Sequence, residues 1–473
     1  MLQFLDRSRE LAFLESKYQD AAAQLIILYG RRRIGKTELV TKFCSNKENI
    51  YFLGRLEAKD DTIRRLNECL VTYFKDSSLV RNPIRNWERF FEYLGLRDDL
   101  QLVLIIDEFP FIVDRFPEIT SILQDKWDST LRKGKLMMIL TGSSIGMMKQ
   151  HALDYKSPLY GRRTGQWKLD KMNVVHLKAF FPWYAIEDLI TVYACIDTIP
   201  GYLSRFNPTK TVLENIRDKI LSKGEFLYDE VEILLREELR DPSNYMSIMA
   251  AIAGGTTKLN EINNATKLDK SLLSKYIHSL ERLEIVESVQ PVTFGYKAEL
   301  KTKGSIHVIK DNFVDFWFRF VYANKNELER GNIDAVFSNP STFNEYLGRK
   351  FERFVLEILP LLGLGAFTRT GKWWHGDVEI DAVGLDDSNK RLLACECKWT
   401  DNVNAMSIAK DLAPKIKEIH WNDGSREETM AIFAKSFSRT TTSFEGIPVQ
   451  CLDLNTMELM LFNSPTASSE KEA

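Results

Sequence analysis

The segment that most constrains the fold of this chain is GRRRIGKT, residues 30–37. It follows residues 24–29, an almost wholly apolar run that predicts a strand buried on both faces of a parallel sheet, and it precedes a helical stretch. Glycines at this spacing let backbone N–H groups turn inward around a phosphate, and the N-terminus of the following helix adds partial positive charge. The segment fits the pattern G-x-x-x-x-G-K-S/T, so the sequence predicts a phosphate-binding loop and a nucleotide site, with a chance match as the alternative.

Residues of this loop are predicted to hold ATP and Mg²⁺. Lys36 is expected to reach the β- and γ-phosphates, and the Thr37 hydroxyl is expected to ligate Mg²⁺. Three adjacent arginines add positive charge beside a triphosphate, and at least one should face solvent or an acidic partner such as Glu108. The other residues expected to contact the nucleotide are Gly30, Arg31, Arg32, Arg33, Ile34, Gly35 and Glu38.

A pair of carboxylates follows a second apolar run, residues 102–106. An acidic residue at the end of a buried parallel strand faces the crevice in which ligands bind. Asp107 is therefore expected to hold Mg²⁺ through water, and Glu108 to polarise the attacking water as a general base. The alternative is a strand that simply ends in exposed carboxylates. Glu108 favours hydrolysis of ATP over binding alone.

Further apolar runs at residues 50–53 and 136–140 alternate with helical stretches, which predicts an α/β domain with a parallel sheet. The last of these runs is followed by Thr141-Gly142-Ser143-Ser144. We expect Ser143, rather than Thr141, to sense the γ-phosphate, and an ordinary turn is the alternative.

Two adjacent arginines, Arg162 and Arg163, follow in the segment LYGRR. A cation at this point of the chain can stabilise transition-state charge as an arginine finger. A solvated basic loop is an equally good interpretation of the same residues.

Length and charge limit the functions of the whole chain. A chain of 473 residues predicts about three domains. A net charge of -2 gives no overall attraction to nucleic acid, so a nucleic-acid surface would have to be a local patch. Six scattered cysteines indicate reduced thiols and a cytoplasmic protein, and the sequence shows neither a signal peptide nor an apolar run long enough to span a membrane.

The middle of the chain has the pattern of a helix-turn-helix. Residues 259–266 and 270–283 predict two helices joined by a short turn, and residues 289–294 with 305–309 predict a wing. Lysines near the wing tip would contact phosphates of DNA without reading sequence: Lys297, Lys301 and Lys303. A lid or a protein-contact module is the alternative.

A second group of carboxylates lies near the C-terminus. Asp381 and Glu396 lie on either side of a turn at residues 386–390, so the two segments should pair as a hairpin. On the second strand Glu396 and Lys398 share a face, because side chains alternate with a period of two. Asp381 and Glu396 with this lysine form a divalent-metal site that can activate water and steady a phosphate.

Two family resemblances follow from these motifs. Residues 1–240 resemble the archaeal-type ATPase family, a part of the STAND/AAA+ group of P-loop NTPases. The residues that carry the resemblance are FLDR with REL near the N-terminus, LYGRRRIGKTEL, IDEFP, TGSS, LYGRR and PGYL. The resemblance implies an AAA+-like core followed by a helical lid and a winged helix. The segment Thr198-Ile199-Pro200 departs from the glycine-rich start expected of the last motif, so a sensor role for that turn does not carry over.

Residues 343–460 are similar to the PD-(D/E)xK nuclease core, a domain commonly appended to the archaeal-type ATPases. Asp381 takes the acidic position on the first strand, with isoleucine instead of proline before it, and Glu396 and Lys398 take the E-x-K positions. The resemblance makes Glu352 the acidic residue on the preceding helix.

The expected fold is α/β: a P-loop NTPase parallel sheet with a helical lid, a winged helix and a C-terminal restriction-endonuclease-like domain. The expected boundaries are 1–178 for the ATPase core, 179–243 for the lid, 244–312 for the winged helix, 313–342 for an aromatic helical connector, 343–462 for the nuclease-like domain and 463–473 for a disordered tail.

The expected function is a Mg²⁺-dependent ATPase that acts on nucleic acid, with ATP gating DNA cleavage by the C-terminal domain. A nucleotide-dependent switch that binds a protein or DNA without cutting is the main alternative. A signalling ATPase with a C-terminal scaffold is a third. ATP and DNA are the expected partners, and the sequence leaves open a protein partner and a homo-oligomer.

Overall fold

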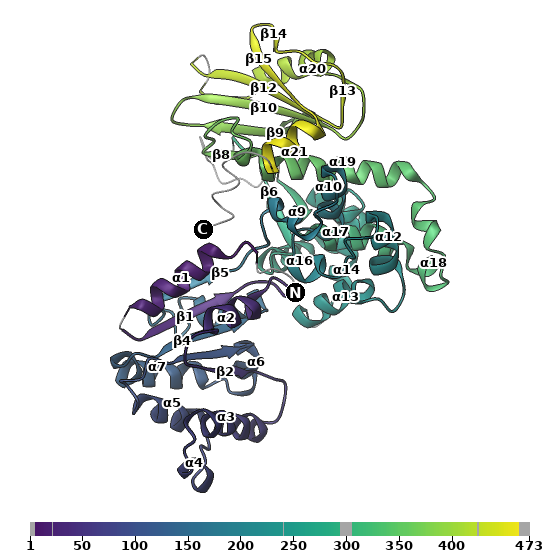
Figure 1. Ribbon diagram of the computed structural model, residues 1–473. Coiled ribbons are helices and arrows are strands. Elements are labelled where there is room, and N and C mark those ends of the chain that lie inside the picture. The colour runs from purple at the N-terminus through teal and green to yellow at the C-terminus, as the bar shows by residue number, and fades with distance from the viewer. Residues whose placement is uncertain (1–4, 21, 240, 294–304, 423–424, 463–473) are drawn as a thin grey trace. The chain divides into compact units, whose positions relative to one another are not determined.

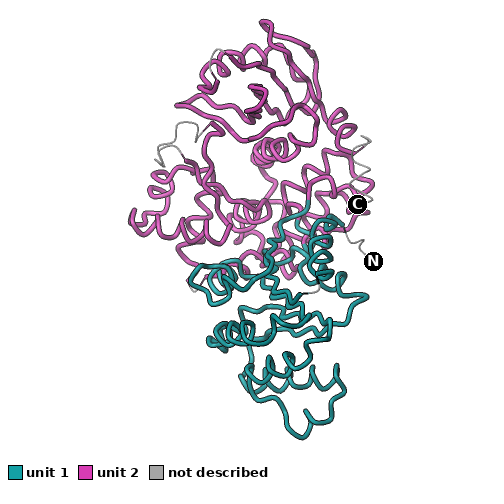
Figure 2. The backbone as a smooth tube through the Cα atoms, turned by 90° about the vertical axis from the view of Figure 1, so that its left-hand side faces the viewer, with its two compact units in different colours: residues 1–172, 199–201 teal, residues 173–198, 202–473 magenta. Residues whose placement is uncertain are grey.

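The computed structural model describes residues 5–20, 22–239, 241–293, 305–422 and 425–462. Phe4 of the family motif, the wing lysines Lys297, Lys301 and Lys303, and the predicted tail 463–473 lie outside these ranges. The chain divides into two compact units (Figure 2). Unit 1 comprises residues 1–172 with 199–201, and unit 2 comprises residues 173–198 with 202–473.

Unit 1 is built on a five-stranded sheet of order β2-β3-β4-β1-β5, in which every pair is parallel. The strands are β1 (Gln24–Tyr29), β2 (Asn49–Leu53), β3 (Val103–Asp107), β4 (Met137–Gly142) and β5 (Gly165–Lys168). The first four confirm the strands predicted from the apolar runs. The short edge strand β5 was not predicted, because its residues are only partly buried and give no apolar run. Since β4 lies between β1 and β3, the ends of these three strands lie side by side.

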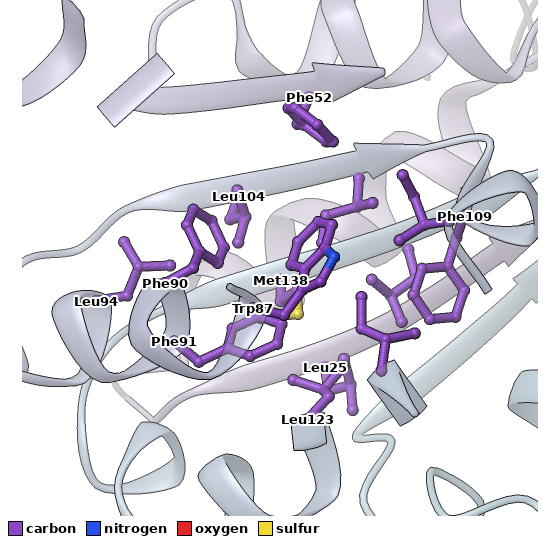
Figure 3. Packing of buried hydrophobic residues seen from close by; sticks show 14 of the residues in the cluster. Leu25, Phe52, Trp87, Phe90, Phe91, Leu94, Leu104, Phe109, Leu123 and Met138 are labelled. Carbon is purple, nitrogen blue, oxygen red and sulfur yellow. The ribbon is translucent and has the colours of Figure 1, made fainter. Parts of the chain in front are cut away.

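Helices cover both faces of this sheet (Figure 1). The helices of unit 1 are α1 (Ser8–Gln19), α2 (Lys36–Cys44), α3 (Lys59–Phe74), α4 (Ser78–Arg81), α5 (Trp87–Gly95), α6 (Phe109–Arg115), α7 (Ile119–Ser129) and α8 (Ile145–Met148), of which α4 lies away from the sheet (Figure 1). Trp87 of α5 packs edge-on against Phe52 of β2 and is surrounded by Phe90 and Phe91 (Figure 3). Deleting one such buried aromatic side chain typically costs about 3–5 kcal/mol of stability. This core fixes β2 and β3, and with them the edge at which the candidate site lies.

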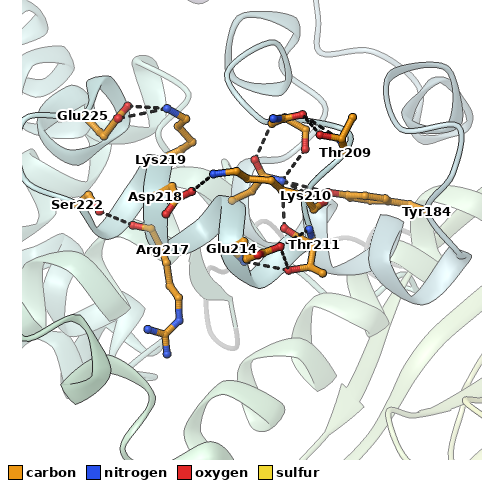
Figure 4. Close-up of polar contacts among 12 residues, drawn as sticks. Tyr184, Thr209, Lys210, Thr211, Glu214, Arg217, Asp218, Lys219, Ser222 and Glu225 are labelled. Carbon is orange, nitrogen blue, oxygen red and sulfur yellow. Dashed lines mark hydrogen bonds and ion pairs between the residues drawn. The ribbon is translucent and has the colours of Figure 1, made fainter.

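The first half of unit 2 is helical. Its helices are α9 (Leu177–Phe180), α10 (Ile186–Ile196), α12 (Val212–Ile216), α13 (Phe226–Glu238), α14 (Ser243–Ala253), α17 (Asn312–Phe316) and α18 (Lys325–Glu329), while α11 (Pro200–Leu203) contains residues of both units. Thr211 and Glu214 form a capping box at the start of α12 (Figure 4). The buried Asn215 amide bonds the backbone of Asn207 in both directions, at 2.7 and 2.9 Å. These contacts fix the loop before α12.

Two predicted helices are confirmed as α15 (Leu259–Thr266) and α16 (Lys270–Arg282). Asp269 caps the second of them, because its carboxylate accepts the backbone N–H of Ser271 at 2.9 Å. The strands that follow, β6 (Val286–Val289) and β7 (Ile306–Ile309), pair antiparallel. The predicted start of the first wing strand at residue 289 is wrong. The strand instead ends there, because pairing with β7 begins at the buried Val286.

The last part of unit 2 is a six-stranded sheet of order β14-β15-β12-β10-β9-β8. Its elements are α19 (Pro340–Ile358), β8 (Arg369–His375), β9 (Val378–Asp386), β10 (Arg391–Lys398), α20 (Ala405–Lys417), β12 (Glu427–Ala434), β14 (Ser443–Phe444), β15 (Ile447–Leu452) and α21 (Leu454–Phe462), with β11 (Val403–Asn404) and β13 (Phe437–Arg439) as a separate pair. The predicted hairpin is confirmed, because β9 and β10 pair antiparallel. Within the described ranges, none of the helices has the length and apolar character that crossing a membrane requires.

Candidate functional site

The loop between β1 and α2 has the backbone conformation of a phosphate-binding loop. Gly35 has φ of +94°, a left-handed conformation that glycine adopts at little cost, and Arg33 has φ of +67°. A Cβ on Gly30 would lie 2.4 Å from the Leu169 carbonyl oxygen, so only glycine fits there. Residues outside the loop also hydrogen bond its carbonyl oxygens. The Arg33 carbonyl accepts the N–H of Gly201 at 3.0 Å, and the guanidinium of Arg7 donates to the Ile34 carbonyl at 3.0 Å.

Lys36 is the first residue of α2, and its side chain is buried. Its ammonium group donates to the carbonyl oxygens of Gly30 at 2.8 Å and Arg31 at 3.0 Å. The ammonium therefore lies inside the loop, which is where an anionic phosphate group would meet both this cation and the N-terminus of α2.

The Asp107 carboxylate, at the end of β3, is buried and fully engaged. One oxygen, Oδ2, accepts the hydroxyls of Thr37 at 3.1 Å and of Tyr51. The other, Oδ1, accepts the Glu108 backbone N–H at 2.9 Å and the Thr141 hydroxyl. Thr37 and Asp107 are thus adjacent, as the predicted cation site requires, and two hydroxyl or carboxylate oxygens suit Mg²⁺.

Glu108 adopts the left-handed conformation, with φ of +51°. A non-glycine residue in this region costs free energy and is often found at functional sites. Its carboxylate accepts the Ser143 backbone N–H at 3.1 Å and also the Ser143 hydroxyl. The backbone at this point is tightly packed, because a Cβ on Gly54 would lie 2.6 Å from the Glu108 carbonyl oxygen. Ser143 therefore orients Glu108, while Thr141 bonds Asp107.

The predicted arginine finger has neighbours within unit 1. Arg162 forms an ion pair with Asp128 at 2.8 Å, and Arg163 lies over the ring of Tyr160 and donates to the Leu153 carbonyl at 3.3 Å. Whether either arginine acts on a phosphate stays a prediction. Glu38, in the first turn of α2, is exposed.

The sequence interpretation missed Tyr51, which is half-exposed on β2 and yet hydrogen bonds Asp107. Burial and this bond to a carboxylate raise the pKa of the Tyr51 phenol, so it keeps its proton near neutral pH. No sequence motif marks this residue. The strand register explains its position, because Tyr51 pairs with Ile105, and Asp107 lies two residues after Ile105 on the same face of the sheet.

Unit 2 contains a second polar cluster. Asp381 on β9 accepts the backbone N–H of Cys397 at 2.8 Å, and Glu396 on β10 bonds the Lys398 ammonium at 2.8 Å. Burial, followed by the charges of Glu352 and Glu396, raises the pKa of Asp381 to about 7. The four residues predicted for this region, Glu352, Asp381, Glu396 and Lys398, therefore lie close enough for their charges to interact.

Two lysines that were not predicted belong to this cluster. Lys372 on β8 is paired with Glu352, and Lys415 on α20 lies 3.4 Å from Glu396. Burial by itself would lower the pKa of Lys398, but Glu396 and Asp381 raise it above its ordinary value. Among the described residues, no group of three or more histidine, cysteine, aspartate or glutamate side chains is arranged to hold a metal ion. Mg²⁺ is nevertheless commonly bound through one or two carboxylates plus substrate phosphates, and Asp381 with Glu396 fits that smaller set.

Two family models match parts of the chain. A family model described as an ATPase domain predominantly from Archaea matches residues 4–206. A second, described as Archaea bacterial proteins of unknown function, matches residues 317–408. The first match includes the loop, Asp107 and Glu108, and the second includes Glu352, Asp381 and Glu396.

Relatives are found in Methanocaldococcus jannaschii. The uncharacterized protein MJECL04 is 35% identical over 428 residues, which are 89% of this chain and 93% of the relative. The uncharacterized ATP-binding protein MJ0423 is 54% identical over 48 residues, which are 10% of this chain and 81% of that protein.

Two solved structures align with parts of this chain. The Walker-type ATPase PABY2304 of Pyrococcus abyssi aligns with a TM-score of 0.47 and 22% identity over 67% of this chain and 96% of its own. The ORC2 protein of Aeropyrum pernix aligns with a TM-score of 0.44 and 12% identity over 70% of this chain and 96% of its own.

Proposed function

Because this chain belongs to the archaeal-type ATPase family, whose ATPase domain it carries at residues 4–206, we propose that unit 1 hydrolyses Mg²⁺-bound ATP at the ends of β1, β3 and β4. The observation that supports this most is the contact of the Thr37 hydroxyl with Asp107 at 3.1 Å, since Asp107 also accepts the backbone N–H of Glu108. On this proposal, Thr37 and Asp107 supply the two oxygen ligands and Glu108 the general base, next to the phosphate-binding loop.

Binding of the triphosphate is assigned to the loop and Lys36. The loop N–H groups and the N-terminus of α2 are partial positive charges, and the Lys36 ammonium is a full one. Lys36 exchanges its bonds to the Gly30 and Arg31 carbonyls for bonds to phosphate oxygens. Thr37 and Asp107 hold Mg²⁺, which when bound neutralises charge on the phosphates.

Hydrolysis is assigned to Glu108. Its carboxylate takes a proton from the attacking water, or orients that water, while Ser143 holds the carboxylate through its N–H and hydroxyl. The Ser143 hydroxyl can turn from Glu108 to an oxygen of the γ-phosphate. Ser143 would then act as the predicted γ-phosphate sensor by exchanging one hydrogen-bond acceptor for another. Tight packing of Gly54 against the Glu108 backbone keeps this geometry fixed.

Glu108→Gln tests this assignment, since glutamine keeps the size and the acceptor oxygen of the side chain but cannot accept the proton. ATP turnover should fall by a factor of about 10²–10⁴, the usual range for a general base, while the Kd for Mg²⁺-bound ATP changes little. A matched control is Glu118→Gln, at an exposed glutamate of unit 1 beyond α6. Full turnover in Glu108→Gln would show that another residue acts as the base.

A second activity is proposed for unit 2, namely metal-dependent cleavage of DNA. The observation that favours it is the arrangement of Asp381, Glu396 and Lys398 on the paired strands β9 and β10, with the pKa of Asp381 raised to about 7. Two carboxylates can hold a divalent cation, and Lys398 can steady the charge of a phosphodiester. The exposed face of α16, which includes Lys270 and Lys275, offers cations for DNA phosphates.

DNA cleavage in Mg²⁺ or Mn²⁺, measured with and without ATP, tests this second activity. Asp381→Asn should abolish cleavage and leave ATP turnover intact. Glu427→Gln removes an exposed carboxylate of β12 that pairs with Arg391, and cleavage should persist in that control. Absence of cleavage by the wild type under every condition would leave a non-cutting nucleotide switch as the function of the molecule.

A further inference from the structure

Tyr51 contacts the carboxylate that the proposed function assigns to Mg²⁺, and no motif gives it a role. Tyr51 lies on β2 and pairs with Ile105 of β3. Asp107, two residues after Ile105, projects from the same face of the sheet. The phenol donates its hydrogen bond to Asp107 Oδ2.

The lone pairs of the Asp107 carboxylate are fully used. An ionised carboxylate has about four lone-pair sites on its two oxygens. In this structure four donors address them: Tyr51 and Thr37 on Oδ2, and Thr141 and the Glu108 N–H on Oδ1. A cation, or a water molecule on that cation, needs one of the same lone pairs. One donor must therefore leave when a cation binds.

The four donors differ in their freedom to leave. The Glu108 N–H is part of the tightly packed backbone, and Thr141 is 1% exposed. Thr37 is itself an expected ligand of the cation. Tyr51 is 38% exposed and lies on the edge strand β2, so its ring can turn toward solvent at the lowest cost.

We infer that the Tyr51 hydroxyl competes with Mg²⁺ for Asp107 Oδ2 and thereby sets the Mg²⁺ affinity of the nucleotide site. The inference rests on the proposed function, because it requires that Mg²⁺-bound nucleotide occupies this site. Tyr51 is a positioning residue: it orients Asp107 and turns away when the cation binds. It does not touch the phosphates.

The experiment is isothermal titration of ADP into the full chain, with saturating Mg²⁺ and, separately, with EDTA. The ratio of the two Kd values reports the contribution of the cation to ADP binding. A substitution that merely weakens the fold would change both Kd values alike and leave the ratio unchanged. Tyr51→Phe should bind ADP about three- to tenfold more tightly in Mg²⁺, the net effect of one ordinary hydrogen bond at a half-exposed position, and equally well in EDTA.

Tyr73→Phe is the matched control. The Tyr73 phenol of α3 also bonds a carboxylate, Glu48 at 2.9 Å, in the same unit but away from the loop. Its Kd ratio should equal that of the wild type.

Three results would overturn the inference. An unchanged ratio in Tyr51→Phe would show that no competition exists. Weaker binding with and without Mg²⁺ would show that the phenol only supports the fold. Absence of ADP binding by the wild type in both conditions would contradict the proposed function itself, and the inference with it.

Discussion

At the scale of the residue, the candidate nucleotide site depends on a few positions with little steric freedom. Glu108 takes a left-handed conformation, and its carbonyl oxygen lies so close to Gly54 that no Cβ fits between them. The proposed base is thus positioned by backbone packing as well as by its hydrogen bonds to Ser143. Such a position predicts that a single added methyl group disturbs catalysis.

Gly54→Ala is the corresponding prediction. The new Cβ would stand 2.6 Å from the Glu108 carbonyl oxygen and 3.0 Å from Ile112, so the backbone has to move. The expected cost is about 1–3 kcal/mol, measured as loss of unfolding free energy in urea, together with a fall in ATP turnover. Gly161→Ala, where nothing lies within 4 Å, is the control and should match the wild type. Equal stability and turnover in Gly54→Ala would contradict the packing argument.

Asp381 gives a prediction for pH. Its carboxyl has a folded pKa of about 7 against an ordinary value of 3.8, so between these values the folded state holds a proton that the unfolded state has lost. Stability should therefore fall as pH rises through this window, by up to about 4 kcal/mol, and stay level above it.

Asp381→Asn removes this group and keeps an acceptor oxygen for the Cys397 N–H. Urea titrations at pH 5 and pH 8 measure the free energy of unfolding. At pH 8 the variant should be more stable than the wild type, and the difference between their unfolding free energies should be smaller at pH 5. The control Glu427→Gln should follow the wild type at both pH values. A gap that is independent of pH would show that Asp381 ionises normally.

At the scale of the element, helix α19 carries a predicted site residue, Glu352, a buried cation, Lys350, and a partly buried one, Arg353. The Lys350 ammonium lies 2.6 Å from the Asp315 carboxylate and 3.1 Å from the Asn312 side-chain oxygen, both on α17. Arg353 donates to the carbonyls of Ile309 at 3.0 Å and Lys310 at 2.5 Å. These contacts fix the orientation of α19, and hence the position of Glu352 beside Asp381.

Lys350→Met tests this role of the helix. The change leaves the partly buried Asp315 carboxylate without this cation, which should cost up to about 3–5 kcal/mol of unfolding free energy. The double variant Lys350→Met/Asp315→Asn removes both charges and should recover part of the loss. Strictly additive costs in the double-mutant cycle would show that the ion pair contributes nothing.

The same scale shows what the sequence could predict. Strands β1 to β4 and helices α15 and α16 were predicted because apolar runs and helical periodicity are local signals. The pairing of Asp381 with Glu396 was predicted because a turn joins the two strands. Tyr51, Lys372 and Lys415 were missed, since each meets its carboxylate only through strand order or helix packing. Strand β5 was missed because an edge strand needs no continuous apolar run.

At the scale of the whole molecule, the two proposed activities are assigned to different compact units. Unit 1 provides the loop, Asp107 and Glu108, and unit 2 provides the carboxylates of β9 and β10 and the polar face of α16. The family match to an ATPase domain covers most of unit 1 and continues into the first helices of unit 2, and the match of unknown function lies within unit 2. ATP hydrolysis is therefore the claim on which the rest of the account depends.

The most direct test is phosphate release from ATP by the full chain in Mg²⁺, compared with Lys36→Ala. Loss of the ammonium group removes a full positive charge that donates to the Gly30 and Arg31 carbonyls. The account predicts turnover by the wild type and none above background for Lys36→Ala, with both proteins equally folded. Equal turnover by the two proteins would contradict the assignment of the nucleotide site.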